Sequence, residues 1–234
     1  MSDRIDDCTT LFRRSWSLYD AITAGNYMFH REFYGEIAAI VSERGQAGDY
    51  TLLDLGCGNA RFLSPCLRAA PPLSYTGVDL SPTALAEAHD YLAGLDGVSL
   101  HEDDMVEFAR RAGEGSFDIV FSGYAMHHLD EADKARLLSA CSAALAPGGS
   151  FLLIDVLRED GQSREDYLTA YLGMMRGEWT AVPAEMIEEA CNHVAAHDQP
   201  SSLAELSALA EEAGLGRITL LANYRQHHLI RFER

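Results

Sequence analysis

Basic residues are scarce in this chain of 234 residues, which has 18 lysines and arginines against 36 aspartates and glutamates. The formal net charge is −18, and a negative field of that size repels the phosphate backbones of DNA and RNA. It also disfavours binding to anionic membrane surfaces. Nothing in the sequence approaches the roughly 20 apolar residues of a membrane helix, and the N-terminus lacks the pattern of a secretory signal. We therefore expect no nucleic acid and no membrane among its partners.

Cysteine is also sparse, and the few that occur are scattered without a C-x-x-C pair. An odd count argues against a disulfide framework, so the sequence predicts a reduced, cytoplasmic protein. Free cysteines are commonly buried, and we expect these five to be small core or loop residues. They are Cys8, Cys57, Cys66, Cys141 and Cys191.

Apolar segments alternate with helical patterns through the middle of the chain. Predicted strands are residues 51–55, 73–80, 98–102, 117–124 and 150–157, and predicted helices follow the first four of them. The first of these helices is expected over residues 59–70, and the second is expected to be capped by Ser81, with Pro82 at its first position. This alternation predicts a doubly wound, Rossmann-like α/β sheet with helices on both faces.

Two further regions read as helical, and the chain ends in a strand pair. Ser202 and Glu205 form an expected capping box, and residues 217–224 and 227–234 are expected to pair as an antiparallel hairpin. The sequence therefore predicts one domain in four parts. These are an N-terminal helical cap (1–46), a core (47–157), a helical insertion (158–200) and a closing helix with two strands (201–234).

The segment LLDLGCGNARFL, residues 52–63, turns from apolar to glycine-rich at the end of the first predicted strand. Gly56 and Gly58 flank Cys57 and lack a Cβ, so a ligand could approach the backbone there. A plain strand-to-helix turn is the alternative interpretation. Asp79 ends the second predicted strand, where an acid can accept both hydroxyls of a ribose.

The third predicted strand ends in Asp103 and Asp104, followed by Met105. An acid and an apolar side chain suit the amino edge and the face of an adenine, although a lone aspartate at a strand end is also a common helix cap. Because the carboxyl ends of parallel strands share one sheet edge, one nucleoside could bridge all three positions.

The pattern favours S-adenosyl-L-methionine over a nicotinamide dinucleotide. The dinucleotide fingerprint G-x-G-x-x-G requires a third glycine, which is missing after Gly58. Asp54 stands just before the glycines, where a carboxylate repels a pyrophosphate but tolerates an ammonium group. The segments LLDLGCGNARFL, YTGVDLSP, EDDM, FDIVFSGYAMHHL and LAPGGSFLLID together resemble the successive motifs of class I S-adenosylmethionine-dependent methyltransferases.

That resemblance implies a seven-stranded sheet with an antiparallel last strand, and it assigns roles to individual residues. It implies that Asp54, Gly56 and Gly58, with Cys57 between them, line the methionine end of the cofactor, and that Ser122 lies near the methionine backbone. It further implies ribose binding by Asp79 and adenine contacts by Leu80, Asp104 and Met105, and Asp103 is a cofactor-binding candidate by its place beside Asp104. Ala60 departs from the glycine most common at its position in the family.

Candidates for catalytic chemistry follow the fourth predicted strand. Tyr124 and His127 are candidate catalytic residues, and His128 lies beside them, although packing within the loop is the alternative for His127. A dedicated base is not required, because the donor is already activated and the enzyme mainly aligns the acceptor. His193 and His197 have a spacing that can bind a metal, but without an evident third ligand we expect no metal site.

The aromatic N-terminal region either packs as core or forms a lid over the cofactor. In the lid interpretation Tyr19 and Tyr27 reach the methionine carboxylate, with Arg31 as a charge partner. The insertion would supply a substrate wall through Tyr167, Tyr171, Met174, Met175 and Trp179. A dimer interface or ordinary helix packing is the alternative interpretation of these residues.

The sequence thus predicts a methyltransferase that acts on an oxygen or nitrogen of a small molecule, with carbon as a further option. The alternatives are an NAD(P)-dependent oxidoreductase and a non-catalytic regulator that binds S-adenosylmethionine. A homodimer is left open.

Overall fold

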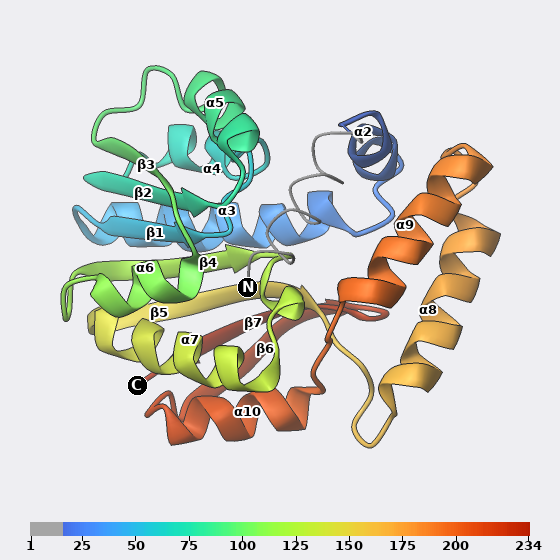
Figure 1. Ribbon diagram of the computed structural model, residues 1–234. Helices are drawn as coiled ribbons and strands as arrows, with labels where there is room; N and C mark the ends of the chain where they lie inside the picture. The colour runs from blue at the N-terminus through green and yellow to red at the C-terminus, as the bar shows by residue number, and fades with distance from the viewer. Residues whose placement is uncertain (1–15) are drawn as a thin grey trace.

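The computed structural model describes residues 16–234, so Cys8 and Phe12 lie outside the described residues. Within this range the chain forms a seven-stranded sheet in the order β3-β2-β1-β4-β5-β7-β6 (Figure 1). Only β7 runs antiparallel to the other strands of this sheet. The predicted fold class is therefore confirmed. The strands are β1 (Thr51–Leu55), β2 (Ser74–Asp79), β3 (Val98–Glu102), β4 (Phe117–Gly123), β5 (Leu145–Val156), β6 (Arg217–Tyr224) and β7 (His227–Glu233).

Helices cover both faces of the sheet and extend past one of its edges. They are α2 (Trp16–Ala24), α3 (His30–Ala47), α4 (Ser64–Ala69), α5 (Pro82–Tyr91), α6 (Met105–Arg111), α7 (Glu131–Ala144), α8 (Arg164–Glu178), α9 (Ala184–His197) and α10 (Leu203–Glu212), with a 3-10 turn η1 (Met126–His128). No helix within residues 16–234 combines the length and the apolar character that crossing a membrane requires.

Two apolar cores hold the layers together. One joins the sheet to α6, α7 and α10, and includes Val106, Leu137 and Leu206. The other joins the opposite face to α3, α4 and α5, and includes Ile37, Leu67 and Ala88. Figure 1 shows these two sets of helices on opposite sides of the sheet.

A third apolar cluster lies beyond the carboxyl ends of the central strands, where α2, α8 and α9 meet (Figure 1). Leu18 and Ile22 of α2 pack there with Tyr167, Tyr171 and Met175 of α8, and Trp179 joins them. The aromatic residues of the insertion thus pack in this cluster, and they do not form the expected substrate wall.

The helix starts follow the local chemistry of the sequence, with one exception. Ser81 accepts a hydrogen bond from the Ala84 N–H, and Ser202 forms a capping box with Glu205, as predicted. The helix predicted over residues 59–70 instead begins at Ser64. Ala60 has a φ of +55°, a left-handed conformation that a right-handed helix cannot contain, so residues 59–63 stay in the loop.

Candidate functional site

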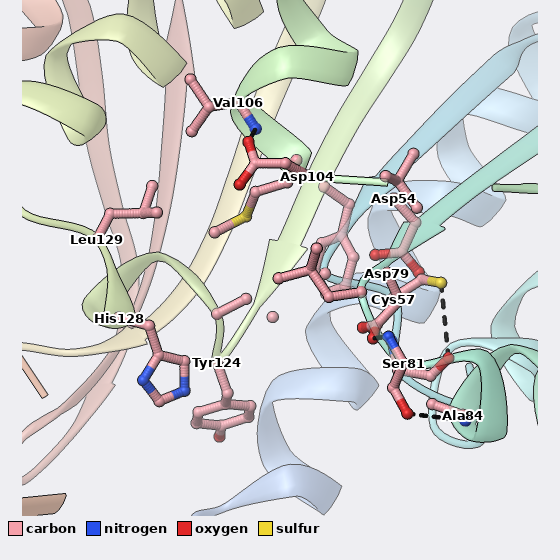
Figure 2. Close-up of a pocket in the computed structure, with 18 of the residues that line it drawn as sticks. Asp54, Cys57, Asp79, Ser81, Ala84, Asp104, Val106, Tyr124, His128 and Leu129 are labelled. Carbon is pink, nitrogen blue, oxygen red and sulfur yellow. Dashed lines mark hydrogen bonds between the residues drawn. The ribbon is translucent and has the colours of Figure 1, made fainter. Parts of the chain in front are cut away.

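A cavity of about 640 Å³ opens at the carboxyl ends of β1, β2 and β4, within the size range of small-molecule sites. Figure 2 shows Asp54, Cys57 and Asp79 on one side of it, with Tyr124 and His128 on the other. The predicted binding residues that line it are Tyr19, Asp54, Gly56, Cys57, Gly58, Asp79, Leu80, Asp103, Asp104 and Met105. Three segments far apart in the sequence thus converge on one site.

The loop after β1 is shaped by its two glycines. The backbone N–H groups of Gly56 and Cys57 both donate to the Val78 carbonyl of β2, which folds the loop back over the neighbouring strand. Gly56 has a φ of +74°, and a Cβ on it would stand 2.5 Å from the Cβ of Ala125. Gly58 also has a positive φ, of +52°, but a Cβ there would meet nothing within 4 Å. Its bare backbone therefore faces open space in the cavity.

Asp79 links this loop to the end of β2. Its Oδ2 accepts from the Gly58 N–H and its Oδ1 from the Ser81 N–H, each at 2.8 Å. Burial raises the pKa of Asp79, and these backbone hydrogen bonds oppose that rise. Each carboxylate oxygen retains a further lone pair that can accept from a ligand hydroxyl.

Asp54 is a buried acid at the base of the cavity. It is only 2% exposed, and its Oδ2 accepts a 2.8 Å hydrogen bond from the Tyr75 hydroxyl. Burial raises the pKa of Asp54 to about 7, although the Tyr75 hydrogen bond lowers it. Among residues 16–234 no ion pair joins Asp54 to a basic side chain. A buried carboxylate of this kind favours a cationic ligand.

The two acids after β3 have different hydrogen-bond and ion-pair partners. Asp104 caps α6 by accepting from the Val106 and Glu107 N–H groups through Oδ1. Asp103 accepts from the Asp104 N–H and forms an ion pair with Arg111. Asp104 is therefore a helix cap, the alternative role expected of an aspartate at a strand end, and it also lines the cavity.

Three predicted cofactor contacts do not line this cavity. The Ser122 hydroxyl is fully buried and donates to the Leu55 carbonyl within the sheet. Tyr27 stacks on Trp179 and accepts from the Ala181 N–H, and Arg31 donates to the Ala24 carbonyl at the surface. Of the proposed lid residues the structure brings only Tyr19 to the cavity, because α2 packs its other face on the insertion.

The two candidate catalytic residues also differ in placement. Tyr124 lines the cavity with a φ of +58°, and a bulky residue in this left-handed region marks local strain. Its hydroxyl donates to the Met28 carbonyl, and burial raises its pKa well above the ordinary value. At neutral pH Tyr124 therefore keeps its proton and acts as a wall of the cavity.

His127 does not line the cavity, because its ring turns inward between two buried carboxylates. Its Nδ1 contacts Asp155, and its Nε2 lies 3.8 Å from an oxygen of Asp198. Burial alone would lower the pKa of His127, but Asp155 and Asp198 raise it to about 9. An imidazole that already carries its proton at neutral pH is not a base, and the neighbouring His128 lines the cavity instead.

Several residues that line the cavity were not predicted as cofactor contacts. Tyr34 of α3 and Phe62 of the loop lie 5.5 Å apart between ring centroids, and the buried ring of His30 packs on Phe62 at 4.4 Å. The end of α9 contributes His197, and Gln199 follows it. The side chains of Tyr34 and His197 reach the cavity through the docking of α3 and α9, which local patterns do not encode.

The order of the strands and the glycine loop after β1 define a Rossmann-like fold of the methyltransferase type. Residues 53–151 match the family model described as a methyltransferase domain. A similar solved structure is an O-methyltransferase family protein from Burkholderia thailandensis, with a TM-score of 0.60 and 18% identity, covering 88% of this chain and 58% of that one.

Two curated relatives are similar over the same part of the chain. One is an uncharacterized methyltransferase from Synechocystis sp., 27% identical over 137 residues, or 58% of this chain and 61% of the relative. The other is a ubiquinone biosynthesis O-methyltransferase from Pseudomonas paraeruginosa, 30% identical over 135 residues, or 57% of this chain and 54% of the relative. The matches thus span between half and two thirds of these relatives. Residues 53–151 are thus similar to methyltransferase domains, which supports the resemblance to class I S-adenosylmethionine-dependent methyltransferases.

Proposed function

We propose that the protein transfers a methyl group from S-adenosylmethionine to an oxygen or nitrogen of a small molecule, with a carbon acceptor as a further option. The observation that carries the proposal is the convergence of the Gly56–Gly58 loop, Asp79 and the Asp104–Met105 pair on one cavity. The buried Asp54 carboxylate supports a ligand that bears an ammonium group and a sulfonium. A pyrophosphate placed at the same point would be repelled.

The chain's own groups would then hold the donor as the family resemblance implies. Asp79 accepts from the ribose hydroxyls, Asp104 from the adenine amino group, and the open backbone at Gly58 accommodates the methionine end. The bound donor supplies a methyl group on a cationic sulfur. The remaining task of the protein is to align the acceptor and exclude water, for which no charged base is required.

The acceptor side of the cavity is walled by aromatic rings, among them Tyr34, Phe62 and Tyr124. Such surfaces suit a small, partly apolar organic acceptor. The net charge of −18 argues against a nucleic-acid acceptor. The four described cysteines, Cys57, Cys66, Cys141 and Cys191, carry free and buried thiols, which supports the proposed cytoplasmic location.

Calorimetry and thermal unfolding with S-adenosylmethionine, S-adenosylhomocysteine and NAD test the cofactor part of this proposal. We expect both sulfur compounds to bind with one site per chain and to raise the unfolding temperature, with no effect of NAD. Stabilisation by NAD alone would instead identify an oxidoreductase. Incubation of a small-molecule acceptor panel with methyl-labelled donor tests transfer. Binding of the donor without transfer to any acceptor would favour the non-catalytic regulator.

A further inference from the structure

Next to the cavity, the turn after β4 and the end of α9 bring imidazole and carboxylate groups together. His127 and His128 belong to η1, and Asp198 directly follows α9. The Gln199 N–H donates to the His127 carbonyl at 2.7 Å, which fastens the two segments to each other. One ligand atom from each of these three side chains can be chosen so that all lie within 4.8 Å of one another.

Asp198 is the least satisfied member of this group. It is 3% exposed, and its Oδ1 makes no hydrogen bond to any residue that the structure describes. The facing atom, Nδ1 of His128, is 3.5 Å away and also lacks a hydrogen bond within the described chain. Separations of 3.5 and 3.8 Å are too long for hydrogen bonds. The Oδ1 atom of Asp198 is therefore compensated by the charge of nearby groups and not by a hydrogen bond, and an ion between the carboxylate and the imidazoles would satisfy both.

Asp155 gives His127 a defined orientation. It holds Nδ1, so the ring presents Nε2 toward Asp198. A carboxylate bound to the far nitrogen of an imidazole is the usual outer-shell arrangement of a metal-binding histidine. Coordination would replace the proton on Nε2 and leave the contact between Nδ1 and Asp155 in place.

We propose that His127, His128 and Asp198 form a binding site for a divalent transition-metal ion. Two imidazole nitrogens and one carboxylate oxygen suit Zn²⁺, Co²⁺ or Fe²⁺ better than Mg²⁺ or Ca²⁺, which prefer oxygen ligands. Metal–ligand distances of about 2.0–2.1 Å place tetrahedral ligand atoms roughly 3.3 Å apart. Atoms that now lie within 4.8 Å of one another therefore need to close by at most roughly 1.5 Å.

The site has access to the cavity, because His128 lines it. A further imidazole, His193, lies 5.8 Å from His128 between ring centroids. A three-residue site of this kind leaves a fourth position for a water or for an oxygen atom of a molecule in the cavity.

The test is metal uptake by the full chain, purified with a tag that contains no histidine. After exposure to Zn²⁺ and gel filtration, elemental analysis is expected to find about one Zn²⁺ per chain, and Co²⁺ to give visible d–d absorption. Mg²⁺ is expected not to compete. Wild-type protein that retains no Zn²⁺ and gives no Co²⁺ spectrum would overturn the proposal without reference to any variant.

Variants locate the ion. Asp198→Asn and His128→Gln are expected to abolish stoichiometric uptake, and Asp155→Asn to weaken it roughly 10- to 100-fold through the outer shell. His89→Gln, which changes an exposed histidine on α5, is the matched control and is expected to bind as the wild type does. Thermal unfolding establishes that each variant is folded. Since His128 is partly exposed, its variant remains informative if Asp198→Asn fails to fold, and unchanged uptake by folded His128→Gln would contradict the assigned ligands.

Discussion

The backbone N–H of Gly58 donates a 2.8 Å hydrogen bond to Oδ2 of Asp79, which fastens the loop after β1 to the end of β2. The side chain proposed to bind the ribose thus also shapes the loop proposed to hold the methionine end. Formation of the loop and placement of the acid are therefore coupled, and substitutions at either position are expected to affect both.

Asp79→Asn is expected to weaken the binding of S-adenosylhomocysteine roughly 10- to 150-fold, because a charge-assisted hydrogen bond of about 1.5–3 kcal/mol is lost. Calorimetry measures the affinity. Asp90→Asn, which neutralises an exposed acid on α5, is the control and is expected to leave it unchanged. Equal affinities for the two variants and the wild type would remove Asp79 from the proposed site.

Gly58→Ala is expected to destabilise the protein by about 1–2 kcal/mol, because φ is +52° in a region that L-residues avoid. The new methyl group also enters the open space of the cavity, so the binding of S-adenosylhomocysteine is expected to be lost.

Gly148→Ala provides the matched comparison, since its φ is +79° and its Cβ also meets nothing within 4 Å. Urea unfolding is expected to show similar destabilisation in both variants, while calorimetry shows normal binding for Gly148→Ala alone. Normal binding by Gly58→Ala would mean that the ligand does not occupy this part of the cavity.

Asp54→Asn is expected to stabilise the unliganded protein increasingly as the pH rises. Burial raises the pKa of Asp54 to about 7 from its ordinary value of 3.8. Its contribution to stability is thus full below about pH 4 and is lost as the pH rises to about 7. The variant has no such loss. The difference in the free energy of unfolding between the variant and the wild type therefore grows by about 1.4 kcal/mol per pH unit between about pH 4 and pH 7.

Urea unfolding of both proteins at pH 5 and pH 8 measures the difference. The same variant is expected to bind S-adenosylhomocysteine more weakly, because the counter-charge for its ammonium group is gone. A difference in stability that stays constant with pH would show that the fold does not raise the pKa of Asp54.

His30→Phe is expected to protect the protein against acid. Burial, and then the nearby Arg61, lower the pKa of His30 to about 4 from 6.5. Its contribution to stability is therefore present above about pH 6.5 and is lost as the pH falls through 4. Phenylalanine cannot take up a proton. Between about pH 6.5 and pH 4 the free energy of unfolding of the variant is therefore expected to fall by up to about 3 kcal/mol less than that of the wild type.

Urea unfolding midpoints measured from pH 7 to pH 4 test how the stability of each protein changes with pH. Repacking beside Phe62 shifts the stability by the same amount at every pH, so it does not affect this comparison. His89→Gln, an exposed substitution, is expected to follow the wild-type slope. Parallel curves for His30→Phe and the wild type would show that the fold does not lower the pKa of His30.

Local patterns predicted the strands and most helix starts because both depend on neighbouring residues. The first and third strands, at residues 51–55 and 98–102, match their predicted bounds, and Ser81 and Ser202 cap the helices expected of them. The spacing of Gly56, Gly58 and Asp79 also predicted the position of the cavity, since parallel strands place their carboxyl ends together.

Tertiary structure decided what completes that cavity. His127 and His128 are adjacent in one short turn, yet the first turns inward to Asp155 and the second lines the cavity. Neither the direction of these rings nor the arrival of Asp198 is encoded by spacing along the chain. The sequence by itself determined the sheet and the acids at its edge, because hydrophobic period and turn chemistry are local. The walls of the cavity and the cluster around His127 required the docking of α2, α3 and α9, which depends on packing between segments that are distant in the sequence.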